Sequence, residues 1–170
     1  VTDSGVDYAA IAQDPAPLNR TLAMLGTVSR STFDAWPRHQ QLAFLVNAHN
    51  AYATARLVRQ WPVASLQSTR MIGDARAQRN IRLLGRRWSL KSLADEVTSD
   101  RYRESRAIFL LNGGEKGCAP PAPVAATAAN LTDLAESQTR RVMSDPRYFT
   151  YDSQRRHVEM TPLVRWYRPA

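Results

Sequence analysis

The side chain with the strongest nucleophilic chemistry in this 170-residue chain is its single cysteine, Cys118. It lies in the segment NGGEKGCAPPAP, residues 112–123, after a glycine-rich turn and before two prolines. Because proline suits the first turn of a helix, this order favours a helix start near the thiol, where backbone N–H groups and the helix dipole stabilise a thiolate. The pattern predicts either a nucleophile or a small, inert, partly buried residue.

A cysteine nucleophile needs a base within hydrogen-bond reach, and that base is usually histidine. The chain has 3 histidines, at positions 39, 49 and 157, and sequence spacing places none of them beside Cys118. His49 falls on an apolar side of a helix pattern, which favours a position in or near the core. No short ligand spacing supports a metal site, and no Walker pattern or dinucleotide fingerprint is present. We therefore expect neither a metal nor a cofactor.

Two asparagines provide the other polar chemistry. Asn47 and Asn50 lie three residues apart in a helix pattern, so they share a face, and Thr54 continues that face. Each amide must find a partner, because an unpaired buried amide costs about 1–3 kcal/mol. In one interpretation the amides tie neighbouring loops, such as the Gly113–Gly114 turn, to the helix. In the other, one asparagine orients a catalytic group or donates to an oxyanion.

The elements that must position these side chains follow from apolar periodicity and from punctuation by proline and glycine. In the first half of the chain we expect a helix that stops at Gly26, a short element over 32–36 and a central buried helix over 37–61. A hairpin over 80–90 that turns at Gly85 and a short helix over 89–97 capped by Ser89 follow. In the hairpin, Leu83, Leu84 and Trp88 are available to the core.

The second half predicts a different mixture. Residues 106–114, RAIFLLNGG, form a continuous apolar run closed by glycines, which is typical of a buried strand. Asn130 with Asp133 resembles a capping box that opens a helix ending at Asp145–Pro146. Two strands over 148–152 and 156–162 follow. We expect one α+β domain over 1–170, with an N-terminal extension of about residues 1–6, flanking helices and a small, mainly antiparallel sheet.

Composition and charge limit the class of partner. The formal net charge is +8 and the pI about 10.4, with 44% hydrophobic and 22% charged residues, as in ordinary globular proteins. Basic residues cluster at Arg82, Arg86 and Arg87, and again at Arg101, Arg103 and Arg106. Such clusters attract anionic polymers or lipid headgroups, but no nucleic-acid-binding motif is present, so we do not expect nucleic-acid binding. No apolar run approaches the ~18 residues of a membrane span.

Several motifs, in order along the chain, are similar to a known family. They are LAFLVNAHNAY, WPVASL, GRRWSLKSLADEV, RAIFLLNGGEKGCAPPA and PLVRWY. They resemble the family patterns AFWiNxYNA, yPvxSI, sLddIEh, RiHFALnCxSxxCPpL and lSxlfxWY. The resemblance is to the domain of unknown function 547 family and spans most of the chain, from residue 6 to residue 167. It implies an α+β fold of the kind described above.

The resemblance also implies which site residues are retained. Asn47, Asn50 and Arg106 match the family pattern, and Cys118 matches its second cysteine. The remaining polar positions of the pattern differ: the strand histidine falls on Ile108, the first cysteine on Gly113, the histidine of sLddIEh on Asp95, and the tyrosine of NxYN on His49. If the family site combines a thiol with imidazoles, this chain has the thiol and lacks both family histidines.

Two hypotheses follow, and the sequence leaves open whether the protein is an enzyme. In the first, the protein is a degenerate, non-catalytic member that binds a small ligand or a protein partner, with an anionic one among the options. The site would be a cleft formed by Asn47, Asn50, Arg106 and residues 112–114 (Asn112, Gly113 and Gly114). In the second, it is a hydrolase or acyl transferase with Cys118 as nucleophile and His49 as base.

The expected compartment follows from the same resemblance. Members of that family are often exported, and the chain begins at Val1 rather than at a methionine. We therefore expect a periplasmic or otherwise extracytoplasmic location.

Overall fold

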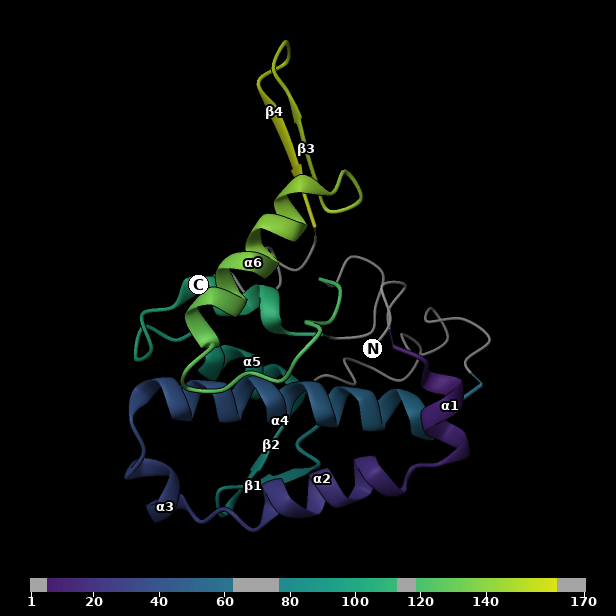
Figure 1. The fold of residues 1–170 in the computed structure, drawn as a ribbon, viewed down its shortest axis with the longest axis vertical. Helices are drawn as coiled ribbons and strands as arrows, with labels where there is room; N and C mark the ends of the chain where they lie inside the picture. The colour runs from purple at the N-terminus through teal and green to yellow at the C-terminus, as the bar shows by residue number, and fades with distance from the viewer. Residues whose placement is uncertain (1–5, 63–76, 113–118, 162–170) are drawn as a thin grey trace.

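The computed structural model describes residues 6–62, 77–112 and 119–161 of the chain. Its central element is α4 (Arg38–Arg59), which crosses the middle of the molecule (Figure 1). The expected start at Pro37 is one position early, because Pro37 is the N-cap and the helix begins at Arg38. Side chains buried on α4 include Leu42, Leu45 and Ala48, each with an exposed fraction of 0%. The expected central buried helix is therefore confirmed.

Three short helices of the described residues precede α4. They are α1 (Tyr8–Gln13), α2 (Ala16–Gly26) and α3 (Arg30–Asp34). Asp7 is the N-cap of α1, and its carboxylate accepts a hydrogen bond from the Ala10 amide at 2.9 Å. Helices α1 and α2 both pack on α4, and Figure 1 shows α2 running alongside it. The predicted stop at Gly26 is confirmed.

A tight hairpin follows, formed by β1 (Ile81–Leu83) and β2 (Arg86–Trp88). Its two central turn residues both have positive φ, 52° at Leu84 and 72° at Gly85, as a type I′ turn requires. Such a φ is unusual for leucine, and burial of the Leu84 side chain at 3% exposure offsets its cost. The turn defines a register in which Arg82 lies opposite Arg87.

Helix α5 (Leu90–Val97) continues directly from this hairpin. Ser89 caps it as expected, accepting a hydrogen bond from the Ser92 amide at 3.0 Å. The Ser92 hydroxyl in turn accepts one from the Ser89 amide at 2.9 Å, which completes a capping box. The apolar face of α5, including Leu93 and Val97, packs on α4.

The expected buried strand over residues 106–114 is wrong where the structure describes it. The chain there forms a 3-10 helix, η2 (Ser105–Leu110), with i→i+3 hydrogen bonds such as that from the Leu111 amide to the Ile108 carbonyl. The Glu104 carboxylate caps its start. The expected burial is correct, with Leu110 1% exposed. An apolar run predicts burial, but it does not distinguish a strand from a helix when no strand is available to pair with it.

The last elements are α6 (Leu131–Ser144), β3 (Phe149–Asp152) and β4 (His157–Met160). Asn130 is the N-cap of α6, but the expected capping box is wrong. The Asn130 side chain binds the preceding residues instead of the helix, accepting from the Thr127 amide and donating to the Ala125 carbonyl. The two strands pair as an antiparallel hairpin that projects from one end of the molecule (Figure 1).

The core confirms the α+β class. One large buried cluster joins α4 to the β1–β2 hairpin, α5, η2 and α6. A second, smaller cluster consists of Ile108, Phe109, Ala119 and Val142. In the described residues the strands form two separate antiparallel hairpins rather than one sheet. None of the described helices is both long and apolar enough to cross a membrane.

Candidate functional site

Asn50 joins α4 to the end of η2 through its carboxamide. Its Nδ2 donates to the Leu110 carbonyl at 2.8 Å, and its Oδ1 accepts from the Asn112 amide at 2.8 Å. Two backbone groups that a neighbouring strand would otherwise pair are satisfied by one side chain. This arrangement explains how residues 110–112 are buried without forming a sheet.

Asn47 makes the same kind of pair one helical turn earlier. Its Nδ2 donates to the Ala126 carbonyl at 2.7 Å, and its Oδ1 accepts from the Ala126 amide at 3.0 Å. We call these two residues the asparagine clamps. The interpretation that they tie neighbouring loops to the central helix is confirmed for residues 110–112 and 126. The suggested partners Gly113 and Gly114 lie outside the described residues.

Between the clamped loops and the N-terminal helices lies an open cleft with a volume of about 650 Å³. Its apolar walls come from α1, α2, α4 and residues 121–126, and include Leu18, Met24, Phe44, Ala51, Pro121 and Val124. Polar groups on its surface come from Thr21, Asn47, Asn50, Thr54 and Asn112. None of the described side chains that line the cleft carries a charge.

The structure therefore brings together three of the predicted binding residues, Asn47, Asn50 and Asn112. The wall formed by α1 and α2 was missed by sequence reasoning. The leucine spacing in residues 18–25 predicted a helix, but nothing in that spacing indicated which side of α4 the helix covers.

His49 lies on another side of α4, in the core. Its side chain is 2% exposed, it does not line the cleft, and its Nδ1 lies 3.3 Å from Oδ1 of Asn50. Burial lowers the pKa of His49 to about 4, because the charged imidazolium loses its hydration, and the hydrogen bond with Asn50 opposes this only in part. The imidazole is neutral at pH 7. The expected core position is confirmed.

Cys118 lies outside the described residues, so its distance to His49 stays untested. The chain that follows it is described from Ala119. Residues 119–130 form turns, bends and irregular segments, and the next helix begins only at Leu131. The prediction that the prolines at 120 and 121 open a helix beside the thiol is therefore wrong. Gln138 of α6 instead holds this segment, donating to the Pro120 carbonyl at 2.6 Å.

Arg106, the remaining predicted binding residue, lies away from the cleft lining. Its guanidinium donates to both oxygens of Glu104, at 2.8 and 2.7 Å, and lies 3.9 Å from Glu136. The hydrogen bond from Arg106 lowers the pKa of Glu104. Arg101 is similarly placed, 2.9 Å from the Gln41 side-chain oxygen and 3.9 Å from both Asp34 and Glu96. This part of the second basic cluster is paired internally.

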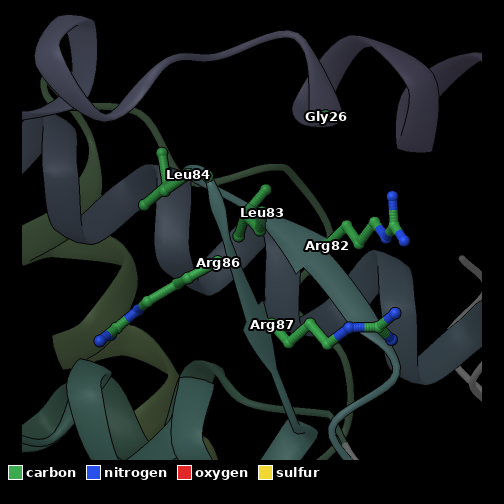
Figure 2. Close-up of a pocket in the computed structure, with 7 residues that line it drawn as sticks. Gly26, Arg82, Leu83, Leu84, Arg86 and Arg87 are labelled. Atoms are coloured by element: carbon green, nitrogen blue, oxygen red, sulfur yellow. The ribbon is translucent and has the colours of Figure 1, made fainter.

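The first basic cluster is arranged differently. Arg82, Arg86 and Arg87 line a second hollow of about 440 Å³ between the β1–β2 hairpin and Gly26 at the end of α2. Figure 2 shows the side chains of Arg82 and Arg87 extending to the same side, while Arg86 points the other way. The Arg86 guanidinium lies over the Trp88 ring, 3.5 Å from its centroid.

Comparisons with models of protein families, with curated proteins and with solved structures found no match. The resemblance to the domain of unknown function 547 family stays a prediction from the motifs. The function is therefore inferred from the two hollows and the residues that form them.

Proposed function

We propose that this protein is a non-catalytic binding protein that holds an uncharged, mostly apolar small molecule in the cleft between α2, α4 and residues 121–126. The observation that carries this proposal is the chemistry of the lining. A volume of about 650 Å³ is in the range of small-molecule sites, which is roughly 300–1,000 Å³. A charged ligand would lose hydration there without gaining an opposite charge from any described lining side chain.

The rim of the cleft supports the same chemistry. Met24 is 71% exposed and Val124 is 55% exposed, and they lie on walls that come from opposite parts of the chain. Large apolar side chains grouped at the edge of a concavity commonly mark a binding surface. An apolar ligand would cover both side chains and remove them from water.

The asparagine clamps support a cleft that is formed before the ligand arrives. They attach two walls of the cleft to α4, so little ordering remains to oppose binding. A carboxamide nitrogen has two N–H groups. One N–H of Asn47 and one of Asn50 are used on backbone carbonyls, and we assign a second N–H to a polar atom of the ligand.

The alternative of a thiol-dependent hydrolase or acyl transferase remains a prediction. Two observations favour the binding proposal over it. His49 is buried and does not line the cleft, so the proposed base is not presented to a substrate there. Residues 119–129, which follow Cys118 in the chain, contain no helix start that could stabilise a thiolate. The alkylation rate of Cys118 against pH tests this alternative: an apparent thiol pKa well below ~8.5 would favour the enzyme.

The proposed compartment remains extracytoplasmic. It is supported by the resemblance to a family whose members are often exported. Detection of the native protein in periplasmic or culture fractions, rather than in the cytoplasmic fraction, would support it.

The binding proposal is tested with the neutral fluorophore N-phenyl-1-naphthylamine, whose emission rises in apolar surroundings. We expect saturable binding to the wild-type protein. Ala51 is half-buried and lines the cleft, so the larger side chain of Ala51→Phe should occupy part of the cleft and weaken binding by about tenfold or more. The matched control is Ala128→Phe, which makes the same change at an exposed turn position outside the cleft. Circular dichroism verifies the fold of both variants.

Absence of saturable binding, or equal binding by both variants, would contradict the proposal. A dimeric mass for the wild-type protein in solution, together with a monomeric mass for Ala51→Phe, would also contradict the proposal. The cleft would then be an interface between two copies of the chain.

A further inference from the structure

We propose that Arg82 and Arg87 form a binding site for a phosphate group, carried by a soluble phosphate ester or by a lipid headgroup. The site lies on the β1–β2 hairpin and is independent of the apolar cleft. Two observations support this proposal: the register of the hairpin and the hollow of about 440 Å³ beside it.

The register places two positive charges together. Arg82 and Arg87 are directly opposite each other in the antiparallel pair, so their side chains share one face of the hairpin. Both are exposed, and Figure 2 shows both guanidinium groups on the same side. Like charges directly opposite each other destabilise a hairpin. A bound dianion would turn this repulsion into attraction to a shared partner.

No carboxylate of the described residues relieves the repulsion. In the described part of the chain, no carboxylate lies within ion-pairing distance of Arg82 or Arg87, whereas Arg101 and Arg106 each have carboxylates within 3.9 Å. Arginine suits phosphate because its planar fork donates two parallel hydrogen bonds to two phosphate oxygens. Two such forks on one face match the double charge of a phosphate monoester.

The neighbouring end of α2 is compatible with an anion. Carbonyls at a helix C-terminus normally repel negative charge. Here the Met24 carbonyl accepts from the Thr27 hydroxyl at 2.8 Å and from the Thr27 amide at 3.2 Å, and the Leu25 carbonyl accepts from the Val28 amide at 3.4 Å. The hollow is also open at this point, because a Cβ added at Gly26 would meet nothing within 4 Å.

Arg86 has a different role from its neighbours. Its guanidinium is held over the Trp88 ring at 3.5 Å and points away from the other two arginines. A cation above an aromatic face already has a favourable electrostatic partner. We therefore assign Arg82 and Arg87, and not Arg86, to the phosphate.

The test titrates inorganic phosphate, and then phenyl phosphate, into 15N-labelled protein while amide shifts are followed at constant ionic strength. We expect saturable shifts centred on residues 81–88 and near Gly26. Arg82→Gln and Arg87→Gln should each weaken binding by about tenfold or more, since each removes hydrogen bonds to a charged group. Arg155→Gln is the charge-matched control, because Arg155 is 85% exposed on the distant β3–β4 hairpin.

A third variant leaves both arginines in place. Gly26→Glu adds a carboxylate to the same hollow and should compete with phosphate, weakening binding by several-fold. Shifts that do not saturate, equal weakening by Arg155→Gln, or unchanged affinity in Arg82→Gln and Arg87→Gln would each overturn the proposal.

A second experiment distinguishes a lipid headgroup from a soluble ester as the source of the phosphate group. Vesicles of phosphatidylcholine with and without phosphatidic acid are sedimented with the protein. Co-sedimentation that requires phosphatidic acid and is lost in Arg87→Gln assigns the lipid headgroup. Saturable binding of phenyl phosphate without co-sedimentation assigns a soluble ester. Oligonucleotide binding that both Arg→Gln variants retain, without phosphate ester binding, would contradict the site.

Discussion

The asparagine clamps and the arginine pair are both polar positions that face a hollow, but they differ in how their partners are supplied. Asn47 and Asn50 each exchange two hydrogen bonds with backbone groups of other segments. Arg82 and Arg87 face each other across a hairpin with no described carboxylate in reach. A satisfied polar group stabilises the fold, whereas an exposed pair of like charges costs stability unless something outside the chain binds it.

The two basic clusters provide a second comparison. In the sequence, the group around residue 82 and the group around residue 101 are equally arginine-rich. In the structure, Arg101 and Arg106 are neutralised by Glu96, Asp34, Glu104 and Glu136. A net charge therefore does not identify a binding surface until the internal ion pairs are known.

The largest expected effect is at the clamps. Asn50→Ala leaves the Leu110 carbonyl and the Asn112 amide without the hydrogen bonds that Asn50 makes to them. We expect the free energy of unfolding to fall by about 4 kcal/mol, since two buried backbone groups each lose a partner and each loss costs roughly 1–3 kcal/mol. Urea denaturation measures it.

The control for the clamp variant is Thr54→Ala, on the same face of α4 and also lining the cleft. It should cost under about 1 kcal/mol. Equal losses in the two variants would mean that the clamps are no more structural than any other polar residue of the cleft, and the comparison would fail.

The next effect concerns His49 beside the Asn50 clamp. Its pKa is about 4 in the folded protein and 6.5 in a free side chain, so the unfolded chain takes up a proton first as the pH falls. The stability contributed by the neutral buried form is complete above pH 6.5 and is lost between about pH 6.5 and 4. The loss is on the order of 3 kcal/mol. Urea denaturation at a series of pH values measures it.

His49→Gln, which cannot titrate, should flatten this acid-induced loss relative to the wild type. The exposed His39, changed to Gln, should leave it intact. A pH profile that is the same in His49→Gln and in the wild type would show that His49 is not the group responsible.

The smallest expected effect is at the arginine pair, where a substitution should raise the free energy of unfolding rather than lower it. Without phosphate, Arg87→Gln removes a like-charge repulsion and should raise the free energy of unfolding by about 0.5 kcal/mol. The gain should shrink as salt is added, because screening weakens surface charges. Arg86→Gln should instead lower stability, since it removes the contact with Trp88. A loss of stability in Arg87→Gln would remove the strain on which the phosphate site depends.

Local features of the fold could be predicted from the sequence. Gly85 indicated the hairpin turn, Ser89 the start of α5, and Gly26 the end of α2, because each depends on interactions within a few residues. The predicted strand at 106–114 failed for the opposite reason. Two of its backbone groups, the Leu110 carbonyl and the Asn112 amide, pair with Asn50, which lies 60 positions from Leu110, and no local pattern contains that information.

The candidate sites divide in the same way. Sequence spacing identified Asn47 and Asn50 as one polar face, since this follows from the period of a helix. It also identified the basic group at 82–87, whose pairing follows from the length of the hairpin turn. Only the tertiary structure decided that the asparagines clamp two loops and that α1 and α2 make an apolar wall beside them. It also decided that Arg101 and Arg106 are paired with carboxylates, whereas Arg82 and Arg87 have no such partner among the described residues. The clamps, the wall and the ion pairs depend on contacts between segments far apart in the chain, and a local sequence pattern carries no information on such contacts.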